Sequence, residues 1–363
     1  VGMTRPHMAD PHIANKVANG LEHRIRPCVG ATYCLDRIYE GGEALCIHNA
    51  ATGREATMPH VITRTEGAAK RVVVVGAGPA GLEAARVAAE RGHAVSLLEA
   101  SGKAGGQLNL ATQLPRRREL AGIVDWRLAE LEHLGVPIRY DCWAEPADVL
   151  ALEPDVVVIA TGGMPQSPPL EEGADLVVSS WEILSGEAKP SGNVLLYDDN
   201  GGHQGMSAAE AIARPGAVLE LVSPERFFAP EIGGMNHVPY MRAFHEAGVR
   251  ITINTRLIAV RRDGNRLVAT LASDYSPGWR DEREVDQIVV EHGTMPNDEL
   301  YFALKPRSRN WGEVDHAALI GGGQLCPQRN PEGSFDLFRI GDAIASRNIH
   351  AAIYDGLRYA LRV

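Results

Sequence analysis

The stretch that decides the fold is Val72–Gly81, which reads VVVVGAGPAG. Its four valines predict a buried strand, because β-branched apolar residues suit a strand that is covered on both faces. The glycines after them permit a tight turn and a close approach of the backbone to a pyrophosphate, and the alanine-rich stretch beyond predicts a helix whose N-terminus favours negative charge. The pattern therefore predicts a dinucleotide site with the turn residues Gly76, Gly78, Pro79, Ala80 and Gly81.

An acidic residue follows this turn at the distance that a nucleotide site needs. The run Val95–Glu99 predicts a second strand, and Glu99 comes 18 residues after Gly81. A carboxylate at the end of that strand can accept hydrogen bonds from a ribose. The alternative is a chance glycine turn in an α/β domain. With strand, helix and acid in place, the sequence favours a bound adenine dinucleotide, or at least its ADP half.

The composition is that of an ordinary soluble protein, with 363 residues, 45% hydrophobic and 23% charged, enough for two or three domains. The net charge of -10 argues against nucleic acid as the main partner. No apolar run approaches the ~18–20 residues that span a bilayer. The opening VGMTRP is no signal peptide and is typical of the end of a strand entering a loop. We therefore expect a cytoplasmic protein and a further domain upstream.

Strands and helices alternate along the rest of the chain. Further strands are predicted at 136–140, 155–160, 194–197, 218–222, 250–254, 267–271, 286–290 and 337–340, and helices at 13–21, 120–134, 206–213 and 349–361. This alternation predicts parallel sheets with helices on their faces. The simplest arrangement is one nucleotide domain interrupted by a second.

Polar residues in three later turns extend the predicted cofactor site. The glycine pair Gly105-Gly106 is followed on one turn by Gln107 and Asn109, although a plain surface loop is the alternative. Thr161 and Gly162 follow one buried strand, and Gly341 and Asp342 follow another. Ligands bind at such strand ends in open α/β sheets. Asp342 can accept a hydrogen bond from a ribityl hydroxyl, or it can simply cap the helix that follows.

Five cysteines are an odd number, and three of them lie close together in Cys28-x5-Cys34-x11-Cys46. Thiols grouped in this way favour metal binding in a reducing compartment over a disulfide framework. Cys142 and Cys326 lie far off and are predicted to be structural.

Together these motifs resemble a known family. GAGPAG, the ATG turn at 160–162, the late GDA at 341–343 and an inserted second domain resemble flavoproteins of glutathione reductase type, with two Rossmann-like dinucleotide-binding domains. More narrowly, RPCVGATYCLDRIY at 26–39 and CIHNA at 46–50 resemble the iron–sulfur segment of the trimethylamine dehydrogenase and 2,4-dienoyl-CoA reductase family. That family has an N-terminal FMN-binding TIM barrel related to old yellow enzyme. The start of this chain resembles the last strand and turn of that barrel, with Arg5 at the flavin phosphate.

The resemblance implies a division of the chain into five parts. Residues 1–25 would end the barrel, and 26–65 would form the iron–sulfur loop and linker. Residues 66–190 and 296–363 would bind FAD, or ADP in its place, and 191–295 would form the second nucleotide-binding-like domain. The GGQLN turn resembles the versions that hold FAD.

Two departures from the family pattern concern the cofactors. The family's second cluster cysteine falls at Ala31, which leaves Cys28, Cys34 and Cys46 for a 4Fe-4S or 3Fe-4S cluster. The thiols could also be relics of a lost cluster. In the second domain, Asp198 and Asp199 stand where NADPH would place its pyrophosphate, so we expect no NAD(P)H there; a variant turn that still binds the nucleotide is the alternative. His203 is expected to be a turn residue.

The resemblance implies a function for the whole enzyme. It is similar to the branch that oxidises N-methyl amino acids such as dimethylglycine and proline betaine. FMN in the barrel would take electrons from the substrate, the cluster would pass them on, and an electron-transfer flavoprotein would accept them. A homo-oligomer without a membrane span is also implied. Two alternatives stay open: an NADPH-dependent enoate reductase, and a separate non-catalytic electron-transfer subunit. No catalytic acid or base can be named within these residues.

Overall fold

The computed structural model describes residues 2–214, 216–321, 323 and 325–363. The chain forms two compact units. Unit 1 consists of Val1–Asn109, Glu119–Met164 and Met295–Val363, and unit 2 consists of Leu110–Arg118 and Pro165–Thr294. Residues 165–190, which the sequence analysis assigns to the FAD/ADP-binding domain, thus lie in unit 2.

Unit 1 is built on a five-stranded parallel sheet with the order β15-β4-β1-β2-β3. The valines of β1 are buried at its centre, as their sequence predicts. The last strand in the chain, β15, pairs with β4, so the C-terminal part of the chain completes the sheet. The strands are β1 (Arg71–Val75), β2 (Ala94–Leu98), β3 (Ile138–Arg139), β4 (Val156–Ile159) and β15 (Asp336–Arg339).

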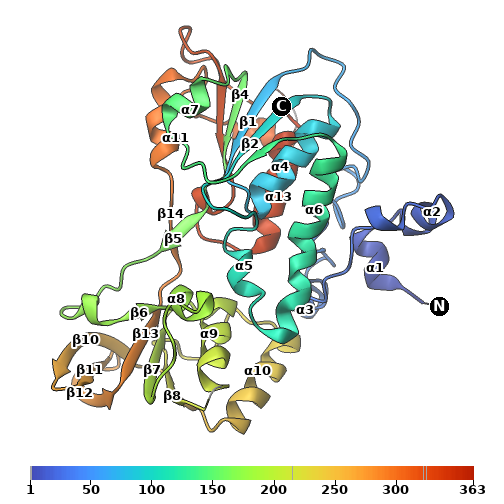
Figure 1. Cartoon of the computed structure of the whole chain (residues 1–363). Helices are drawn as coiled ribbons and strands as arrows, with labels where there is room; N and C mark the ends of the chain where they lie inside the picture. The colour runs from blue at the N-terminus through green and yellow to red at the C-terminus, as the bar shows by residue number, and fades with distance from the viewer. Residues whose placement is uncertain (1, 215, 322, 324) are drawn as a thin grey trace. The chain divides into compact units, whose positions relative to one another are not determined.

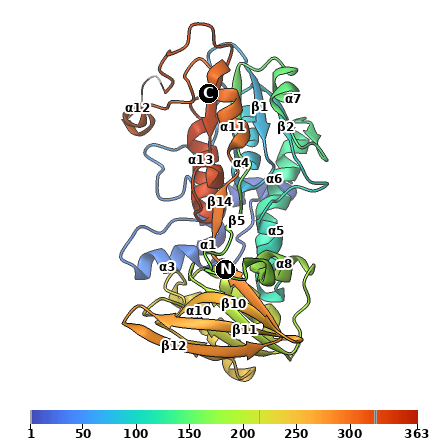
Figure 2. The same cartoon turned by 90° about the vertical axis from the view of Figure 1, so that its left-hand side faces the viewer.

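Helices cover both faces of this sheet (Figure 1). Three of them, α4 (Pro79–Glu90), α6 (Gly122–His133) and α13 (Ile349–Ala360), lie together on one face. On the other face, α7 (Pro146–Leu150) and α11 (Glu299–Leu304) pack on alternate strand residues such as Val73 and Val157. Figure 2 shows the same layers from the side. Both faces of the sheet are therefore buried, which explains the continuous apolar runs of β1 and β4.

Shorter elements complete unit 1, and others lie where the chain passes from one unit to the other. The elements within unit 1 are α1 (Thr4–Ala9), α2 (Ile13–Ala18), η1 (Glu22–Arg24), α3 (Tyr33–Tyr39), η4 (Lys305–Arg307), α12 (His316–Gly321) and η5 (Gly341–Ala343). The elements at the crossings are α5 (Leu108–Ala111), η2 (Pro115–Ala121), β5 (Gly163–Pro165) and β14 (Thr294–Pro296). The last two pair as a two-stranded sheet.

Unit 2 has a parallel sheet of its own, in the order β6-β13-β7-β8-β9. One face packs on α8, α9 and α10, where Leu196 meets Ile212 and Phe244. The other face packs on an antiparallel sheet of β10, β11 and β12. The elements are η3 (Ala174–Leu176), β6 (Val178–Ser179), α8 (Ser180–Ser185), β7 (Asn193–Asp198), α9 (His203–Ala213), β8 (Val218–Val222), α10 (Gly234–Glu246), β9 (Arg250–Thr252), β10 (Arg256–Asp263), β11 (Arg266–Ser273), β12 (Ser276–Val285) and β13 (Gln287–Glu291).

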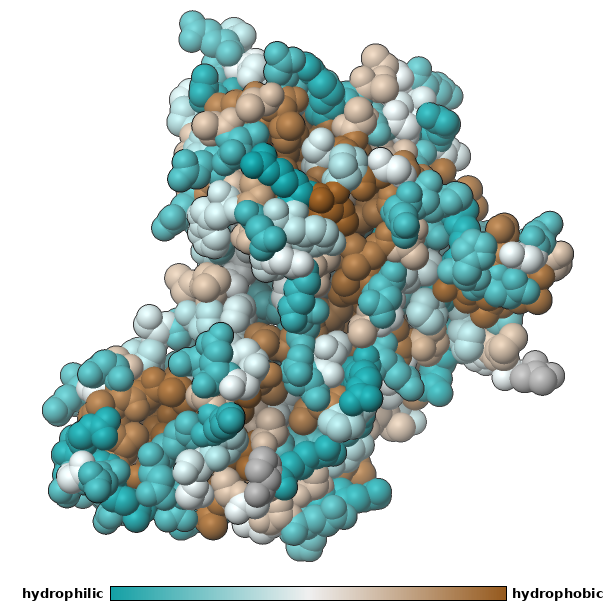
Figure 3. Space-filling view, in the orientation of Figure 1, coloured by the Kyte–Doolittle hydropathy of each residue, from teal (hydrophilic) through white to brown (hydrophobic). Residues whose placement is uncertain are grey.

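The α/β fold class is confirmed, whereas two local expectations are wrong. Residues 4–9 form helix α1 and not the end of a strand. The cysteine-bearing stretch contains helix α3 and is not a continuous loop. Hydrophilic residues make up much of the face shown in Figure 3, and apolar ones appear between them in patches. Within the described ranges, no helix combines the length and the apolar character that crossing a membrane requires.

Candidate functional site

The turn between β1 and α4 has the geometry of a phosphate cradle. Gly76 has φ +103°, and a Cβ atom there would collide with the carbonyl of Ala160, the residue after β4. Gly81, the third residue of α4, lies so close to the Gly76 carbonyl that no side chain fits between them. These two glycines are therefore required for the strand, the turn and the helix to pack together.

Gly78 has a different role, because the space beside it is open. It is the N-cap of α4, and among the described residues a Cβ atom there would have no neighbour within 4 Å. The N-terminus of α4, with Pro79 as its first residue, points its free amide groups toward this space. Such a helix end attracts phosphate. The residues present therefore fit the pyrophosphate of FAD or ADP.

Glu99 lies beside this turn, at the end of β2. Its Oε2 accepts a hydrogen bond from the Ala77 amide at 2.7 Å, and its Oε1 accepts two from Ser101 at 2.8 Å. The carboxylate thus holds the turn in place, a role that the sequence did not predict. Its position at the strand end next to the cradle is the one that ribose recognition requires.

Three of the predicted site residues, from distant parts of unit 1, meet where the strands β4 and β15 end. Gln107 Nε2 donates to Asp342 Oδ2 at 3.3 Å, and Gly162 lies beside the same amide. Asp342 Oδ1 also accepts from the Arg347 amide at 3.1 Å. Burial raises the pKa of the Asp342 carboxyl. The predicted residues 107, 162 and 342 therefore form one polar cluster at the strand ends of β4 and β15.

Other predicted site residues form hydrogen bonds or close contacts with the backbone of the protein. The Thr161 hydroxyl donates to the Asn297 carbonyl, and Asn109 Nδ2 donates to the Ala104 carbonyl at 3.0 Å. Gly106 lies against Gly78 and has φ +51°. These contacts shape the turns around the cradle.

Sequence reasoning missed two residues of α13 that hold this helix in place. Gly356 lets α13 touch α4, because a Cβ atom there would lie 2.5 Å from the Ala80 carbonyl. Asp355, fully buried, accepts from the Gly341 amide at 3.1 Å and pairs with Arg347 and Arg358. The only sequence signals were a glycine and an acid next to each other inside a largely apolar helix.

The three clustered cysteines are free thiols, with Cys28 exposed and Cys34 and Cys46 partly buried. Burial raises the pKa of Cys34 and of Cys46, and the charge of the nearby Cys28 adds to the effect in both. The three thiols therefore share one neighbourhood, and thiolates are the usual ligands of iron–sulfur clusters. Within the described ranges, however, no three His, Cys, Asp or Glu side chains are arranged to hold a metal ion.

Two buried histidines hold this cysteine segment, residues 26–54, in place. One joins two parts of the segment, and the other joins the segment to the nucleotide-binding fold. His48 Nδ1 lies 3.0 Å from the Pro27 carbonyl and so joins the parts that carry Cys46 and Cys28. His350, on α13, places Nδ1 2.9 Å from the Cys46 carbonyl. A carbonyl only accepts, so both Nδ1 atoms carry the proton. No sequence pattern indicates these pairings, because the partners are far apart in the chain.

A buried ion pair also joins the cysteine segment to α4. Arg127 on α6 donates to Glu83 at 2.8 Å and to the His48 carbonyl at 3.1 Å. Arg86 donates to the other oxygen of Glu83 at 2.6 Å. All three charged side chains are almost completely buried. The helix that begins at the cradle is thus linked through Glu83 and Arg127 to the residues that follow Cys46.

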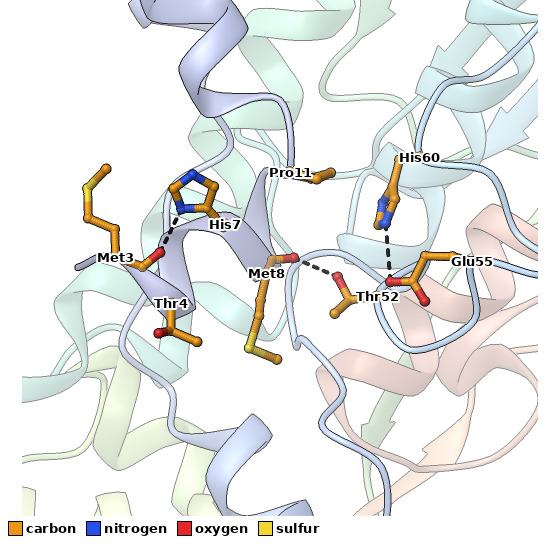
Figure 4. A pocket seen from close by; sticks show the side chains of 8 residues that line it. All are labelled: Met3, Thr4, His7, Met8, Pro11, Thr52, Glu55 and His60. Atoms are coloured by element: carbon orange, nitrogen blue, oxygen red, sulfur yellow. Dashed lines mark hydrogen bonds and ion pairs between the residues drawn. The ribbon is translucent and has the colours of Figure 1, made fainter. Parts of the chain in front are cut away.

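The remaining cysteines lie apart from these groups, whereas the charge of Arg5 acts on Cys34 and opposes the rise in its pKa. Cys142 and Cys326 are buried, and burial raises the pKa of Cys326 to about 12. Arg5 is exposed on α1. Its neighbours line an open hollow of about 520 Å³, shown in Figure 4, with the residues Met3, Thr4, His7, Met8, Pro11, Thr52, Glu55 and His60. The Thr52 hydroxyl donates to the Met8 carbonyl at 2.6 Å and holds α1 to the cysteine segment.

The turn between β7 and α9 in unit 2 is built differently from that of unit 1. Asp198 is buried, and its Oδ1 accepts from the amides of Asn200 and Gly201 at 2.9 Å each. Burial, with Glu291 nearby, raises the pKa of Asp198 to about 7. His203 is the first residue of α9, and its Nδ1 lies 3.0 Å from Arg117 and 3.2 Å from the Tyr240 hydroxyl.

We predict that Asp198→Asn stabilises the protein near neutral and alkaline pH. The folded pKa of about 7 exceeds the usual 3.8, so stability falls as the pH rises between these values. Asparagine keeps the acceptor oxygen but cannot ionise, so we expect a gain of about 2–4 kcal/mol at pH ~8 and almost none at pH ~4. Urea unfolding at the two pH values measures this difference. An equal change at both would contradict the assignment.

Comparison with known proteins agrees with this geometry. The chain is 56% identical over 358 residues to "Probable N-methylproline demethylase" of Rhizobium meliloti, covering 99% of this chain and 52% of that protein. It is 46% identical over 373 residues to "N,N-dimethylglycine/sarcosine dehydrogenase" of Chromohalobacter salexigens, covering 99% and 53%. The structure of histamine dehydrogenase from Rhizobium sp. 4-9 matches with TM-score 0.84 and 26% identity, covering 99% of this chain and 51% of that one. The chain thus spans about half the length of the curated relatives it matches.

The fold and the open cradle define a dinucleotide-binding oxidoreductase of the flavoprotein type. The family model described as "Pyridine nucleotide-disulphide oxidoreductase" matches residues 70–353, and the chain belongs to this family. The relatives also confirm the resemblance to the trimethylamine dehydrogenase group and its branch of N-methyl amino acid demethylases.

Proposed function

We propose that this chain is the electron-transfer half of a flavoprotein that removes methyl groups from N-methylated amino acids. The observation that carries the proposal is the 56% identity, over 99% of the chain, to a protein named as an N-methylproline demethylase. The open cradle at Gly78 supports it, because it leaves room for the pyrophosphate of FAD. Substrate oxidation would take place outside residues 1–363, in a barrel that binds FMN.

The chemistry of the whole reaction sets what this half must do. Oxidation of an N-methyl group to an iminium ion releases two electrons and a proton, and water then converts the iminium into formaldehyde and the demethylated amine. The electrons must leave for an external acceptor, for which we propose an electron-transfer flavoprotein. In the turn between β7 and α9 of unit 2, the buried Asp198 already accepts two backbone amides. This turn therefore favours electron transfer to an external acceptor over the alternative of an NADPH-dependent enoate reductase.

We also propose that Cys28, Cys34 and Cys46 hold an iron–sulfur cluster. The thiol donors fit the group chemically, and Cys28 lies near enough to raise the pKa of Cys34 and of Cys46, although three thiols are fewer than the usual four. A cluster held there would transfer electrons one at a time. The contacts of His48 and His350 support the proposal, because they fix the backbone of the segments that carry the thiols.

The substrate proposal is tested with the full-length protein and N-methylproline or N,N-dimethylglycine without oxygen. We expect bleaching of the flavin absorbance and one formaldehyde per methyl group removed. Bleaching by NADPH but not by either amine would instead identify an enoate reductase. Release of ADP rather than FAD on denaturation would decide which nucleotide occupies unit 1.

The cluster proposal predicts that Cys34→Ser lowers the iron content and removes the visible absorbance of the cluster. The serine hydroxyl is a poor substitute for a soft thiolate ligand. Iron and acid-labile sulfide per chain are the measurements. Cys142→Ser is the matched control, because that thiol is free but buried elsewhere in unit 1. Equal iron in both variants and in the wild type would exclude Cys34 as a ligand.

A further inference from the structure

One backbone position can be compared in the two units: the glycine that caps the helix following the central strand of each parallel sheet, β1 or β7. Gly78 caps α4 and Gly202 caps α9, both with extended backbone, and each helix has a glycine as its third residue. A Cβ atom on Gly78 would meet nothing within 4 Å among the described residues, whereas one on Gly202 would lie 2.8 Å from Gln204 Oε1 and 3.6 Å from Asn200 Nδ2. The space that is open in unit 1 is therefore filled by side chains in unit 2.

Asp198 occupies a second part of the turn between β7 and α9 in unit 2. A Cβ atom on Gly205, the third residue of α9, would collide with the Asp198 carboxylate, whereas one on the corresponding Gly81 in α4 would meet the Gly76 carbonyl and the Ala160 methyl group and no acidic side chain. The carboxylate also accepts the amide hydrogens of Asn200 and Gly201. Amide groups of such a turn are the donors that bind a pyrophosphate. In unit 2 they are already used by the protein.

The acidic surroundings oppose a phosphate as well. Glu291 on β13 is the register partner of Asp198 on β7, and it holds Asn200 through a 3.1 Å hydrogen bond from Nδ2. Asp199, next in the chain, lies 2.8 Å from His292. Three acidic side chains thus surround one turn, and like charges that lie close together in a partly buried site repel.

We infer that Asp198, Asn200 and Gln204 occupy the place of a pyridine nucleotide's pyrophosphate, and that Asp198 is the specificity-determining residue that closes unit 2. The inference rests on the proposed function in one respect: it explains why the electrons must leave through a protein acceptor. Replacement of Asp198 frees two backbone donors and removes one acidic group from the turn. Removal of the Gln204 side chain opens the space beside Gly202. Arg117 already lies near the N-terminus of α9, 3.0 Å from His203, and can contribute positive charge.

The test is the binding of NADPH and NADH to the full-length protein by isothermal titration calorimetry. We expect at most weak binding to the wild type and at least tenfold tighter binding to the double variant Asp198→Ala, Gln204→Ala. Gln204→Ala alone should behave as the wild type, since the carboxylate remains. Flavin or ADP content of unit 1 reports whether each variant is folded. If the double variant does not fold, Asp198→Asn with Gln204→Ala is used, with a smaller gain expected.

Asp286→Ala is the matched control. Asp286 also packs over a glycine and accepts a backbone amide, from Asn193 at 2.7 Å, but it precedes β13 and so lies at the opposite edge of the same sheet. It should gain no nucleotide binding. A folded double variant without binding would overturn the inference and leave the proposed function standing. Tight binding of NADPH to the wild type would overturn both the closure and the proposed direction of electron flow.

Discussion

Gly78→Val is expected to weaken dinucleotide binding strongly and to leave the fold intact. Valine suits the backbone at this position, where φ is -73° and ψ is 179°. A Cβ atom there would have no described protein atom within 4 Å other than its chain neighbours, so the side chain would extend into the space proposed for the pyrophosphate. A steric overlap of this kind costs about 3 kcal/mol, or roughly a 100-fold loss of affinity. FAD and ADP released from the purified variant, and titration with ADP, measure the effect.

Gly234→Val provides the control for that substitution. Gly234 is the first residue of α10, and a side chain there also finds open space. The control should keep its nucleotide and its melting temperature. Normal nucleotide occupancy in Gly78→Val would show that the cradle lies elsewhere.

Glu83→Ala is expected to destabilise unit 1 by about 3–5 kcal/mol, because it leaves buried guanidinium groups without their counter-ion. Arg127 and Arg86 both donate to this carboxylate. Urea unfolding of the variant and of the wild type measures the loss. We also expect the cysteine segment to become more accessible to thiol reagents, since Arg127 holds the His48 carbonyl.

An exposed ion pair is the control for this effect. Arg71 and Glu153 lie 2.7 Å apart on the surface, and Arg71→Ala should change the stability by no more than about 1 kcal/mol. Burial alone would raise the pKa of Glu83, but the charges of Arg127 and Arg86 outweigh it and hold that pKa below its usual 4.5. The pair therefore stabilises the fold above that pH, and its contribution is lost as the pH falls further. Similar losses in both variants would contradict the role of the buried pair.

The parts of the fold that the sequence predicts well are those whose signal is local. The strand β1, its glycine turn and the start of α4 follow one another in ten residues, so their geometry is contained in the pattern itself. The strands of unit 2 that face apolar layers on both sides were likewise predictable. By contrast, β12 (SPGWRDEREV) is mostly exposed and polar, so its sequence lacks the apolar run that marks a strand. It is a strand because it pairs with β11, and this pairing becomes apparent only in the three-dimensional structure.

The same limit applies to the site. Gln107 and Asp342 could each be proposed from a strand-end turn, but not their contact, which joins residues 235 positions apart. Glu99 was predicted for its distance from Gly81, and its hydrogen bond to Ala77 adds a structural role. The acids of the DDNGG turn suggested repulsion of a phosphate. That Asp198 takes over the backbone donors depends on its side-chain conformation, which no motif contains.

The order of the chain has a consequence for biosynthesis. Unit 1 uses the first, a middle and the last portion of the chain, and β15, Asp342 and Gly356 all come from its final portion. A ribosome must therefore synthesise the residues up to α13 before the cradle gains its last wall, since domains fold as their residues emerge. Cofactor loading would then be a late event in maturation, and messages truncated before α13 would yield chains that never acquire nucleotide.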